Sequence, residues 1–306
     1  MMWILGVLIV SFVATAVLGL LAKWVDRKIT ALVQWRVGPP WYQNFADIMK
    51  LLGKETIVPV GARRTGFLLW PVVGLSGAAL AAAVLWMVNG NPGKSFVADM
   101  IGVIYLLVLP SLAIIMGGSA SGNPQSGLGS SREMKLLFGY ELPFILALVT
   151  VIIAVGTLNL GEIIRFQGEH GWMLLKPSAL IGFLIAIICI QAKLGLVPFD
   201  IAEAETEIMS GPFLEYSGPP LALFYLTKAM LLIVLPMFLI TVFWGGFALR
   251  GIGLLTSVIK YVIILVVLTL IRNTNPRLRI DQAVRFFWFL LFPIALIAVL
   301  LALKGY

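Results

Sequence analysis

The sequence contains very few side chains that could hold a metal ion or form a disulfide. Among its 306 residues there is one cysteine, Cys189, and one histidine, His170. A single cysteine excludes an internal disulfide and an iron–sulfur cluster, because such clusters are held by several thiolates. A single histidine is typical of an ordinary polar position, since a zinc site needs three or four ligands. We therefore expect that this chain binds no cofactor itself.

Charged residues are also scarce. They make up 12% of the chain, whereas hydrophobic residues make up 60% and the mean hydropathy is +1.03. A soluble domain is about one quarter charged and about half apolar, so this composition indicates a protein that crosses a membrane several times. The net charge of +8 does not indicate nucleic-acid binding, because the basic residues are confined to particular loops.

Motifs that mark a catalytic centre are missing as well. The chain has no CxxC or HExxH, no GxGxxG that opens a helix after a strand, and no GxxxxGK[ST] phosphate loop. Nothing in it resembles a nucleophile with its base. We therefore expect a chain that is non-catalytic by itself.

Long apolar runs, in contrast, are abundant. A membrane-spanning helix needs about 20 mostly apolar residues. Eight segments approach that length, at residues 3–21, 67–88, 100–117, 142–160, 179–196, 221–243, 252–271 and 286–303. They predict an all-α integral membrane protein with about eight transmembrane helices, forming one domain over residues 1–306. The first segment is interpreted as a membrane helix because it lacks the basic start of a signal peptide.

The distribution of basic residues predicts an orientation. With residues 22–66 placed inside, 15 of the 22 Lys and Arg residues fall in inside loops and five fall outside. Such an excess is typical of cytoplasmic loops. We expect a multi-pass protein of the cell membrane with both termini outside and the large loops in the cytoplasm.

The first inside loop, residues 22–66, contains a predicted amphipathic helix at residues 41–54. Phe45, Ile48, Met49 and Leu52 recur at helical spacing, which suits a helix lying in the membrane interface. The loop is either a passive anchor on the membrane surface or a docking platform for a soluble partner. The residues proposed for docking are Arg27, Lys28, Arg36, Trp41, Asp47 and Lys50.

Five of the chain's 14 acidic residues lie in a second inside loop, residues 197–220. These five residues are Asp200, Glu203, Glu205, Glu207 and Glu215. No Lys or Arg lies between Lys193 and Lys228, so the sequence suggests acids without basic partners. One interpretation is a solvated acidic loop. The apolar residues among the acids favour a segment packed in protein instead, where non-helical backbone is tolerated at membrane depth.

Three further charges lie in or beside predicted spans. Glu141 stands at the start of the fourth span, while Lys228 and Lys260 lie inside the sixth and seventh. Ionisable groups in a membrane are costly and mark functional sites by default, although a helix-end group can also reach water. We add all three to the candidate coupling residues. The Gly- and Ser-rich residues 118–131 are expected to form a small flexible loop.

Three motifs identify a family resemblance. VDRKITALVQWRVGPP with DIMKLLGKE, FGYELPF, and VPFDIAEAETEIMSGPFLEYSGPPLALF together resemble the membrane subunit 1 family of respiratory complex I over nearly the whole chain. The resemblance implies that a chain of glutamates, at Glu141, Glu203, Glu205, Glu207 and Glu215, leads into the membrane. Gly38-Pro39-Pro40 runs straight into Trp41, a shorter form that looks more like the branch of membrane-bound energy-converting [NiFe]-hydrogenases, formate hydrogenlyase and membrane-bound sulfane sulfur reductase.

The resemblance implies a membrane-anchoring and coupling subunit of a redox-driven ion pump. The [NiFe] or related active site and the iron–sulfur clusters would then belong to partners: a hydrogenase-like large subunit and iron–sulfur subunits, beside antiporter-like and small membrane subunits. One alternative is the quinone-site subunit of a complex I-type oxidoreductase. Another is a stand-alone secondary transporter, against which stands the lack of an inverted repeat in the hydropathy. Whether H⁺ or Na⁺ moves is left open.

A physical mechanism follows from the clustered acids. Burial and mutual repulsion raise the pKa values of neighbouring carboxyl groups, and such groups titrate as a set. A nearby charge or a small loop movement then changes how many protons the set holds. We expect the acidic stretch and Glu141 to convert a redox event in a docked arm into ion movement.

Overall fold

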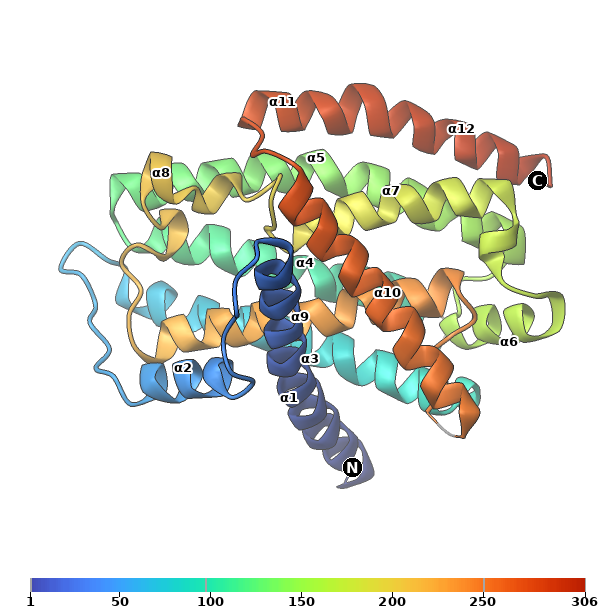
Figure 1. Ribbon diagram of the computed structural model, residues 1–306, viewed down its shortest axis with the longest axis horizontal. Helices are drawn as coiled ribbons and strands as arrows, with labels where there is room; N and C mark the ends of the chain where they lie inside the picture. The colour runs from blue at the N-terminus through green and yellow to red at the C-terminus, as the bar shows by residue number, and fades with distance from the viewer. Residues whose placement is uncertain (1, 97, 250, 306) are drawn as a thin grey trace.

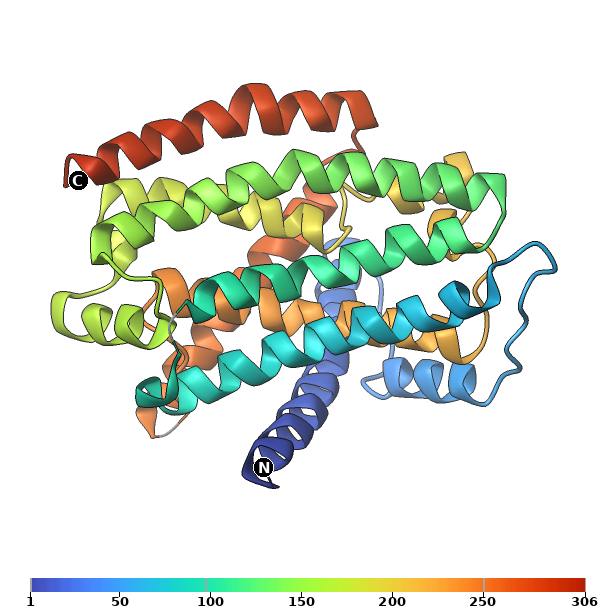
Figure 2. The ribbon, with the colours of Figure 1, turned by 180° about the vertical axis from the view of Figure 1, so that it is seen from behind.

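The computed structural model describes residues 2–96, 98–249 and 251–305, without the side chains of residues 2–5, 205 and 206. Within these limits every regular element is helical (Figures 1 and 2). Seven helices are long and apolar enough to cross a membrane, and α7 (Pro177–Lys193) is a shorter apolar one. The seven are α1 (Met2–Val33), α3 (Arg64–Gly90), α4 (Asp99–Ala120), α5 (Pro124–Val155), α9 (Pro219–Phe243), α10 (Ile252–Thr274) and a C-terminal helix. This confirms the all-α fold with about eight membrane helices.

The C-terminal helix is continuous but not uniform. It consists of α11 (Ile280–Arg285), a π-helical turn η5 (Phe286–Leu291) and α12 (Phe292–Leu303). The inward residues Phe287 and Leu291 lie in this turn and are buried. Phe287 packs against Tyr140 of α5 and against Phe199 of the acidic stretch. The turn therefore joins the C-terminal helix to two segments that carry candidate residues.

Helix α9 forms the centre of the bundle. In its most apolar window 89% of the residues are buried, against 28% in α1 and α10. Figures 1 and 2 show it between α3 and α4 on one side and α7 on the other. Lys228 is the only charged residue in its sequence, and a helix that is apolar all round is expected to be buried. Helices α1 and α10 instead cross the front of the bundle in Figure 1.

The connections between helices gather at the two ends of the bundle. One end, called here the α2 end, carries α2 (Gln43–Leu52), η3 (Ile201–Glu203), α8 (Glu205–Ile208) and η4 (Gly211–Phe213). The opposite end, the α6 end, carries η1 (Pro92–Lys94), α6 (Leu160–His170) and η2 (Met173–Leu175). Figure 1 shows α2 and α8 at one side and α6 at the other. The two predicted loops with candidate residues therefore share one end.

Helix α2 confirms the predicted amphipathic helix of the first loop. Its side chain Asn44 is buried and donates to the backbone carbonyl of Leu20 on α1, at 2.9 Å. Arg27 of α1 donates to the same Asn44 side chain, also at 2.9 Å. The predicted loop boundaries were wrong on the N-terminal side, because α1 continues to Val33 and includes residues 22–33. Its basic residues extend the helix beyond the apolar run that defined the predicted span.

The expectation of a flexible loop at residues 118–131 was wrong. Helix α4 continues to Ala120, and α5 starts at Pro124 after Asn123, whose side chain accepts a hydrogen bond from the backbone of Gln125. A Cβ atom on Gly129 would lie 2.6 Å from Cδ of Pro212. The small residues thus let α5 approach η4 closely, as small residues do between membrane helices.

Candidate functional site

The acidic stretch, residues 197–220, is packed between helices rather than exposed as a loop. Its apolar side chains Phe199, Ile201, Ile208 and Phe213 are buried. Gly211 has a φ of +51° and approaches the carbonyl oxygen of Ala202 so closely that a Cβ atom would clash. The apolar residues therefore fold the stretch onto α5 and α9 through short turns. This is the packing that the apolar residues predict.

The suggestion that these acids have no basic partners was wrong. Lys228 of α9 forms an ion pair with Glu203. Arg132 of α5 lies 2.5 Å from Glu207. The guanidinium group of Arg277, between α10 and α11, lies 2.8 Å from the carboxylate of Asp200. All three partners come from other segments of the chain, so the gap in basic residues along the sequence does not exist in space.

Asp200 is the acid whose surroundings alter its titration. Burial raises the pKa of its carboxyl group from the ordinary 3.8, although the guanidinium of Arg277 acts in the opposite direction. Its Oδ1 atom is buried and has no hydrogen-bond partner among the described residues. A carboxylate with one unsatisfied oxygen is costly to keep ionised. Asp200 can therefore take up a proton more readily than an exposed aspartate.

Glu141 lies deeper, on α5, and its partner is Lys193 at the end of α7. The ammonium group of Lys193 is 3.0 Å from Oε2 and 3.4 Å from Oε1 of Glu141. The Lys193 side chain is 1% exposed and also lies over the rings of Tyr140 and Phe144. A buried ammonium group of this kind depends on its carboxylate partner.

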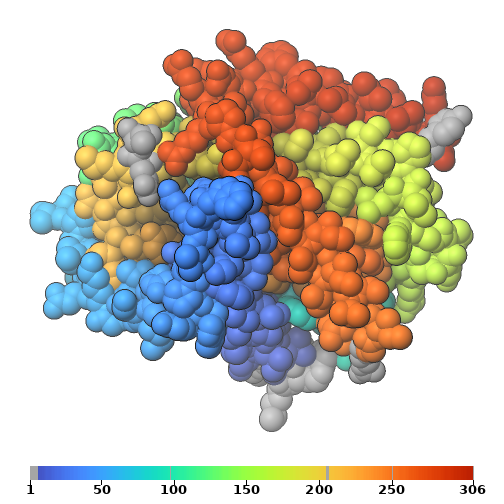
Figure 3. All heavy atoms as spheres, in the orientation of Figure 1, coloured from blue at the N-terminus to red at the C-terminus, as the bar shows by residue number. Residues whose placement is uncertain are grey.

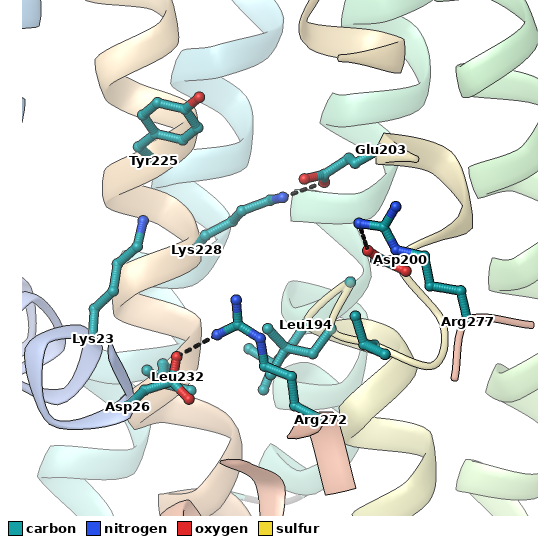
Figure 4. Close-up of a pocket in the computed structure, with 13 residues that line it drawn as sticks. Lys23, Asp26, Leu194, Asp200, Glu203, Tyr225, Lys228, Leu232, Arg272 and Arg277 are labelled. Carbon is teal, nitrogen blue, oxygen red and sulfur yellow. Dashed lines mark hydrogen bonds and ion pairs between the residues drawn. The ribbon is translucent and has the colours of Figure 1, made fainter. Parts of the chain in front are cut away.

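A cavity of about 290 Å³ opens beside these ion pairs (Figure 4). Four cations and three carboxylates line it: Lys23, Lys228, Arg272, Arg277, Asp26, Asp200 and Glu203. Figure 4 shows the pairs Lys228–Glu203, Arg277–Asp200 and Arg272–Asp26 around it. The last pair is 2.6 Å long, and Asp26 also accepts from Thr269. We call this space the charged cavity.

A second cavity lies next to the first and reaches α2. It has a volume of about 360 Å³ and is lined by residues of α1, α2 and α9, among them Asp47, Lys50 and Ile48. Lys23 and Tyr225 line both cavities, and the ammonium group of Lys23 lies 5.2 Å from the centre of the Tyr225 ring. These two residues therefore separate the charged cavity from the space beside α2.

The remaining coupling candidates lie apart from the charged cavity. Glu215 accepts a 2.6 Å hydrogen bond from Asn123 between α4 and α5, and the Glu207 side chain is 55% exposed. The side chain of Glu205 lies outside the described residues. Lys260 is on the far part of α10, where it donates to the carbonyl oxygen of Trp244 at 2.6 Å. Of the eight candidates, Asp200, Glu203 and Lys228 line the charged cavity.

The proposed docking residues divide into two groups. Arg27 and Asp47 form a 3.7 Å ion pair that holds α2 against α1, and Lys28 donates to the carbonyl oxygen of Val37. Arg36, Trp41 and Lys50 are exposed. The space-filling view shows the first loop and α2 (blue) beside the acidic stretch (gold) on one face of the molecule (Figure 3). Gly218 also packs on the backbone of Glu55.

Several charged residues of the site escaped the sequence interpretation. They are Lys23, Asp26, Glu133, Lys193, Arg272 and Arg277. Glu133 carries a signal that could have revealed it, because it lies seven residues before Tyr140 and so on the same face of α5. No group of three or more His, Cys, Asp and Glu side chains suited to a metal occurs among the described residues.

Comparison with known proteins places this architecture in a family. The model of the family described as NADH dehydrogenase matches residues 5–303. The chain belongs to the NADH dehydrogenase family. Its relatives include a membrane-complex component named as a subunit of the NADH-quinone oxidoreductase of Thermomicrobium roseum, which is 37% identical over 94% of this chain and 92% of the relative. The corresponding NADH-quinone oxidoreductase subunit of Syntrophobacter fumaroxidans is 34% identical, over 97% and 96%.

A solved structure extends the likeness within the NADH dehydrogenase family to the three-dimensional level. A chain of the membrane-bound sulfane sulfur reductase, an archaeal respiratory membrane complex, matches with a TM-score of 0.89 and 28% identity. The match covers 98% of this chain and 99% of that chain. The two chains therefore share the same fold from end to end, including the segments that form the charged cavity.

Proposed function

We propose that this chain is the membrane subunit that couples electron transfer in a docked hydrophilic arm to ion translocation. The observation that carries the proposal is the arrangement of ion pairs from the surface into the membrane. Arg277–Asp200 and Lys228–Glu203 line the charged cavity, and Lys193–Glu141 lies beyond them. The relatives named as subunits of NADH-quinone oxidoreductase, and the match to a respiratory membrane complex, support a role in such an assembly.

The paired charges can act as a switch. Each ion pair holds its carboxylate ionised, and a movement that separates the pair leaves a buried charge that favours proton uptake. Because the groups share one cavity, a change at one pair alters the proton occupancy of the next. One pKa unit corresponds to about 1.4 kcal/mol. A small movement of the acidic stretch, driven by the redox arm, can therefore move an ion.

The hydrophilic arm is proposed to dock on the α2 end, which we assign to the cytoplasm. The exposed Arg36, Trp41 and Lys50 and the adjoining acidic stretch form this surface. The partners proposed for it are a hydrogenase-like large subunit and iron–sulfur subunits, with antiporter-like and small membrane subunits along the helices. The [NiFe] or related site and the iron–sulfur clusters belong to those partners. The shorter first loop, and the full-length match to the sulfane sulfur reductase chain, support this branch.

The coupling role is tested by replacing Glu141 with Gln in the assembled complex. Electron transfer and ion uptake are measured together in proteoliposomes, with a reduced viologen dye as the electron donor. We expect the ion uptake per electron to fall, because Gln keeps the shape of Glu141 but cannot be protonated or form an ion pair. Uptake and electron transfer both at the wild-type level would refute the assignment of Glu141.

The docking role needs point variants rather than a deletion of residues 41–54. Removing α2 would expose the buried contacts of Asn44 with α1, and any loss of partners would then be ambiguous. Trp41→Ala and Lys50→Glu change exposed side chains only. We expect these variants to release soluble subunits during purification, while Leu254→Ala, an exposed position near the α6 end, retains them. Equal retention in all three variants would argue against docking on α2.

A quinone-reducing complex is the second candidate, and it is favoured by the names of the relatives. The cavity of about 360 Å³ beside α2 is the space that a quinone head group would enter from the membrane interface. This candidate predicts quinone in the purified complex and inhibition by quinone-site blockers. Absence of both, together with dye oxidation coupled to another acceptor, would favour the first candidate.

A further inference from the structure

Helix α5 carries a buried carboxylate that the motifs do not single out. Glu133 is 6% exposed. Of the ion pairs between described residues, none includes it. An unpaired buried carboxylate is expensive, so its position calls for a reason.

The surroundings of Glu133 place it between two of the ion pairs. A small cavity of about 10 Å³ is lined by Glu133, Glu203, Lys228 and Lys193. Glu203 and Lys228 form one pair, and Lys193 pairs with Glu141. Both Glu203 and Lys228 also line the charged cavity. Glu133 is therefore the carboxylate that lies between the charged cavity and the deeper Glu141.

Two hydroxyl groups hold Glu133 in this position. Ser111 of α4 is a hydrogen-bonding neighbour of Glu133, and its Oγ lies 3.1 Å from the hydroxyl group of Tyr140. A hydroxyl group has one proton to donate. When Ser111 donates to Glu133, Tyr140 donates to Ser111. Both side chains are buried, so water does not compete for these bonds.

The charge of the cluster leaves room for one mobile proton. With every group ionised, the carboxylates of Glu133, Glu141 and Glu203 outnumber the ammonium groups of Lys193 and Lys228 by three to two. The cluster then has one net negative charge in a buried site, which is unfavourable. One added proton neutralises it. In a set of coupled groups that proton belongs to the cluster as a whole.

We propose that Glu133 carries a proton between the Glu203–Lys228 pair and the Glu141–Lys193 pair; this inference rests on the proposed coupling function. A proton leaves the carboxyl group of Glu203, and an O–H bond forms at Glu133, which becomes neutral. Lys193 then gives a proton to the Glu141 carboxylate and takes the proton of Glu133. Glu133 and Lys193 regain their starting charges, Glu141 is protonated, and no electrons move.

The same geometry favours a proton over a metal cation. Two ammonium groups line the small cavity and would repel Na⁺. A volume of about 10 Å³ holds about one water molecule, which is too little for a cation with its ligand shell. A proton needs only a series of hydrogen-bonding groups within reach. We therefore assign H⁺ as the ion that passes this part of the chain.

The test uses the intact complex in proteoliposomes with the viologen donor and an enclosed pH-sensitive dye. Glu133→Gln keeps the size of the side chain and removes the titratable group. We expect proton uptake per electron to fall to the background while dye oxidation continues, and Glu133→Asp to restore part of the uptake. Ser111→Ala is expected to lower the ratio less, because it removes the hydrogen bond and leaves the carboxyl group in place.

Infrared difference spectroscopy supplies a readout that a purely structural role would not change. In the wild-type complex we expect a redox-linked C=O band of a protonated carboxylic acid that is absent in Glu133→Gln and shifted in Ser111→Ala. If Glu133→Gln does not assemble, the band shift in Ser111→Ala and the uptake of Glu133→Asp decide the question. An unshifted band with wild-type uptake in both variants would overturn the proposal.

Glu141→Gln separates this inference from the proposed function. Reduced uptake in Glu141→Gln with normal uptake in Glu133→Gln would refute the role of Glu133 and leave the coupling function intact. Normal uptake in both variants would refute the inference and the role of Glu141 in coupling. Uptake of Na⁺ in place of H⁺ by the wild-type complex would overturn the assignment of the proton.

Discussion

The ammonium group of Lys193 is bound to both carboxylate oxygens of Glu141, at 3.0 and 3.4 Å, across the contact between α7 and α5. The two residues are 52 positions apart in the sequence. Lys193 ends an apolar helix, and Glu141 lies in the middle of another. The pair thus fixes the relative position of two helices and also holds the deepest carboxylate of the proposed path ionised.

The first prediction concerns this pair. Lys193→Met removes the cation and leaves the Glu141 carboxylate without its partner, which we expect to destabilise the complex by about 3–5 kcal/mol. The double variant Lys193→Met with Glu141→Leu has no buried charge at this site and should recover most of that loss. Thermal unfolding of the purified complexes measures both effects. Additive losses in the double variant would show that the two groups do not stabilise one another.

The second prediction concerns the pH dependence caused by Asp200. Burial raises the pKa of this carboxyl group above 3.8 in the folded chain, so the folded state binds a proton that the unfolded state releases. The stability from this group is therefore complete below about pH 3.8 and is lost as the pH rises through the folded pKa. Asp200→Asn removes the titration. We expect the wild type to lose stability relative to the variant as the pH rises over that range.

Arg277→Gln provides the control for Asp200. The guanidinium group lowers the pKa of Asp200, so its removal should raise that pKa further and move the loss of stability to higher pH. The measurement is the thermal unfolding temperature of each variant across a pH series. A constant difference between wild type and Asp200→Asn at every pH would contradict the raised pKa.

The sequence predicts those features that depend on local patterns. The number of membrane helices follows from hydropathy, and α2 follows from the spacing of Phe45, Ile48, Met49 and Leu52. The partners of the acids could not be predicted in the same way. Arg132 and Glu207 are 75 residues apart, and their contact depends on how α5 packs on the acidic stretch. Hydropathy contains no information on the relative rotation of two helices.

Composition alone also gave the wrong structure for residues 118–131. Gly and Ser are frequent both in flexible linkers and on the contact faces of membrane helices. The neighbour decides between these outcomes: here it is Pro212 of η4, against which Gly118 and Gly129 pack. Glu133 was overlooked for a related reason. Its importance comes from Lys193, Glu203 and Lys228, which reach it from other segments.

The third prediction tests that packing. In Gly129→Ala the new Cβ atom would lie 2.6 Å from Cδ of Pro212, so α5 or η4 must shift, at a cost of about 1–3 kcal/mol. Gly127 is on the same helix, and a Cβ atom added there would have no neighbour within 4 Å among the described residues. Gly127→Ala should therefore be neutral or stabilising by up to about 1 kcal/mol. Thermal unfolding compares the two variants, and equal stability would contradict a tight contact at Gly129.

The last prediction asks how far the coupling residues extend along the bundle. Lys260 donates to the carbonyl oxygen of Trp244, directly after the end of α9, and lies over the rings of Trp172 and Trp244. A cation at a helix C-terminus satisfies a free carbonyl group and interacts favourably with the helix dipole. From this geometry we expect Lys260→Met to lower the unfolding temperature and to leave ion uptake per electron unchanged. Lys260→Arg keeps the charge and should retain more of the stability. A reduced uptake ratio in Lys260→Met, with electron transfer and assembly intact, would instead place Lys260 in the ion path, as its position inside a membrane helix suggests.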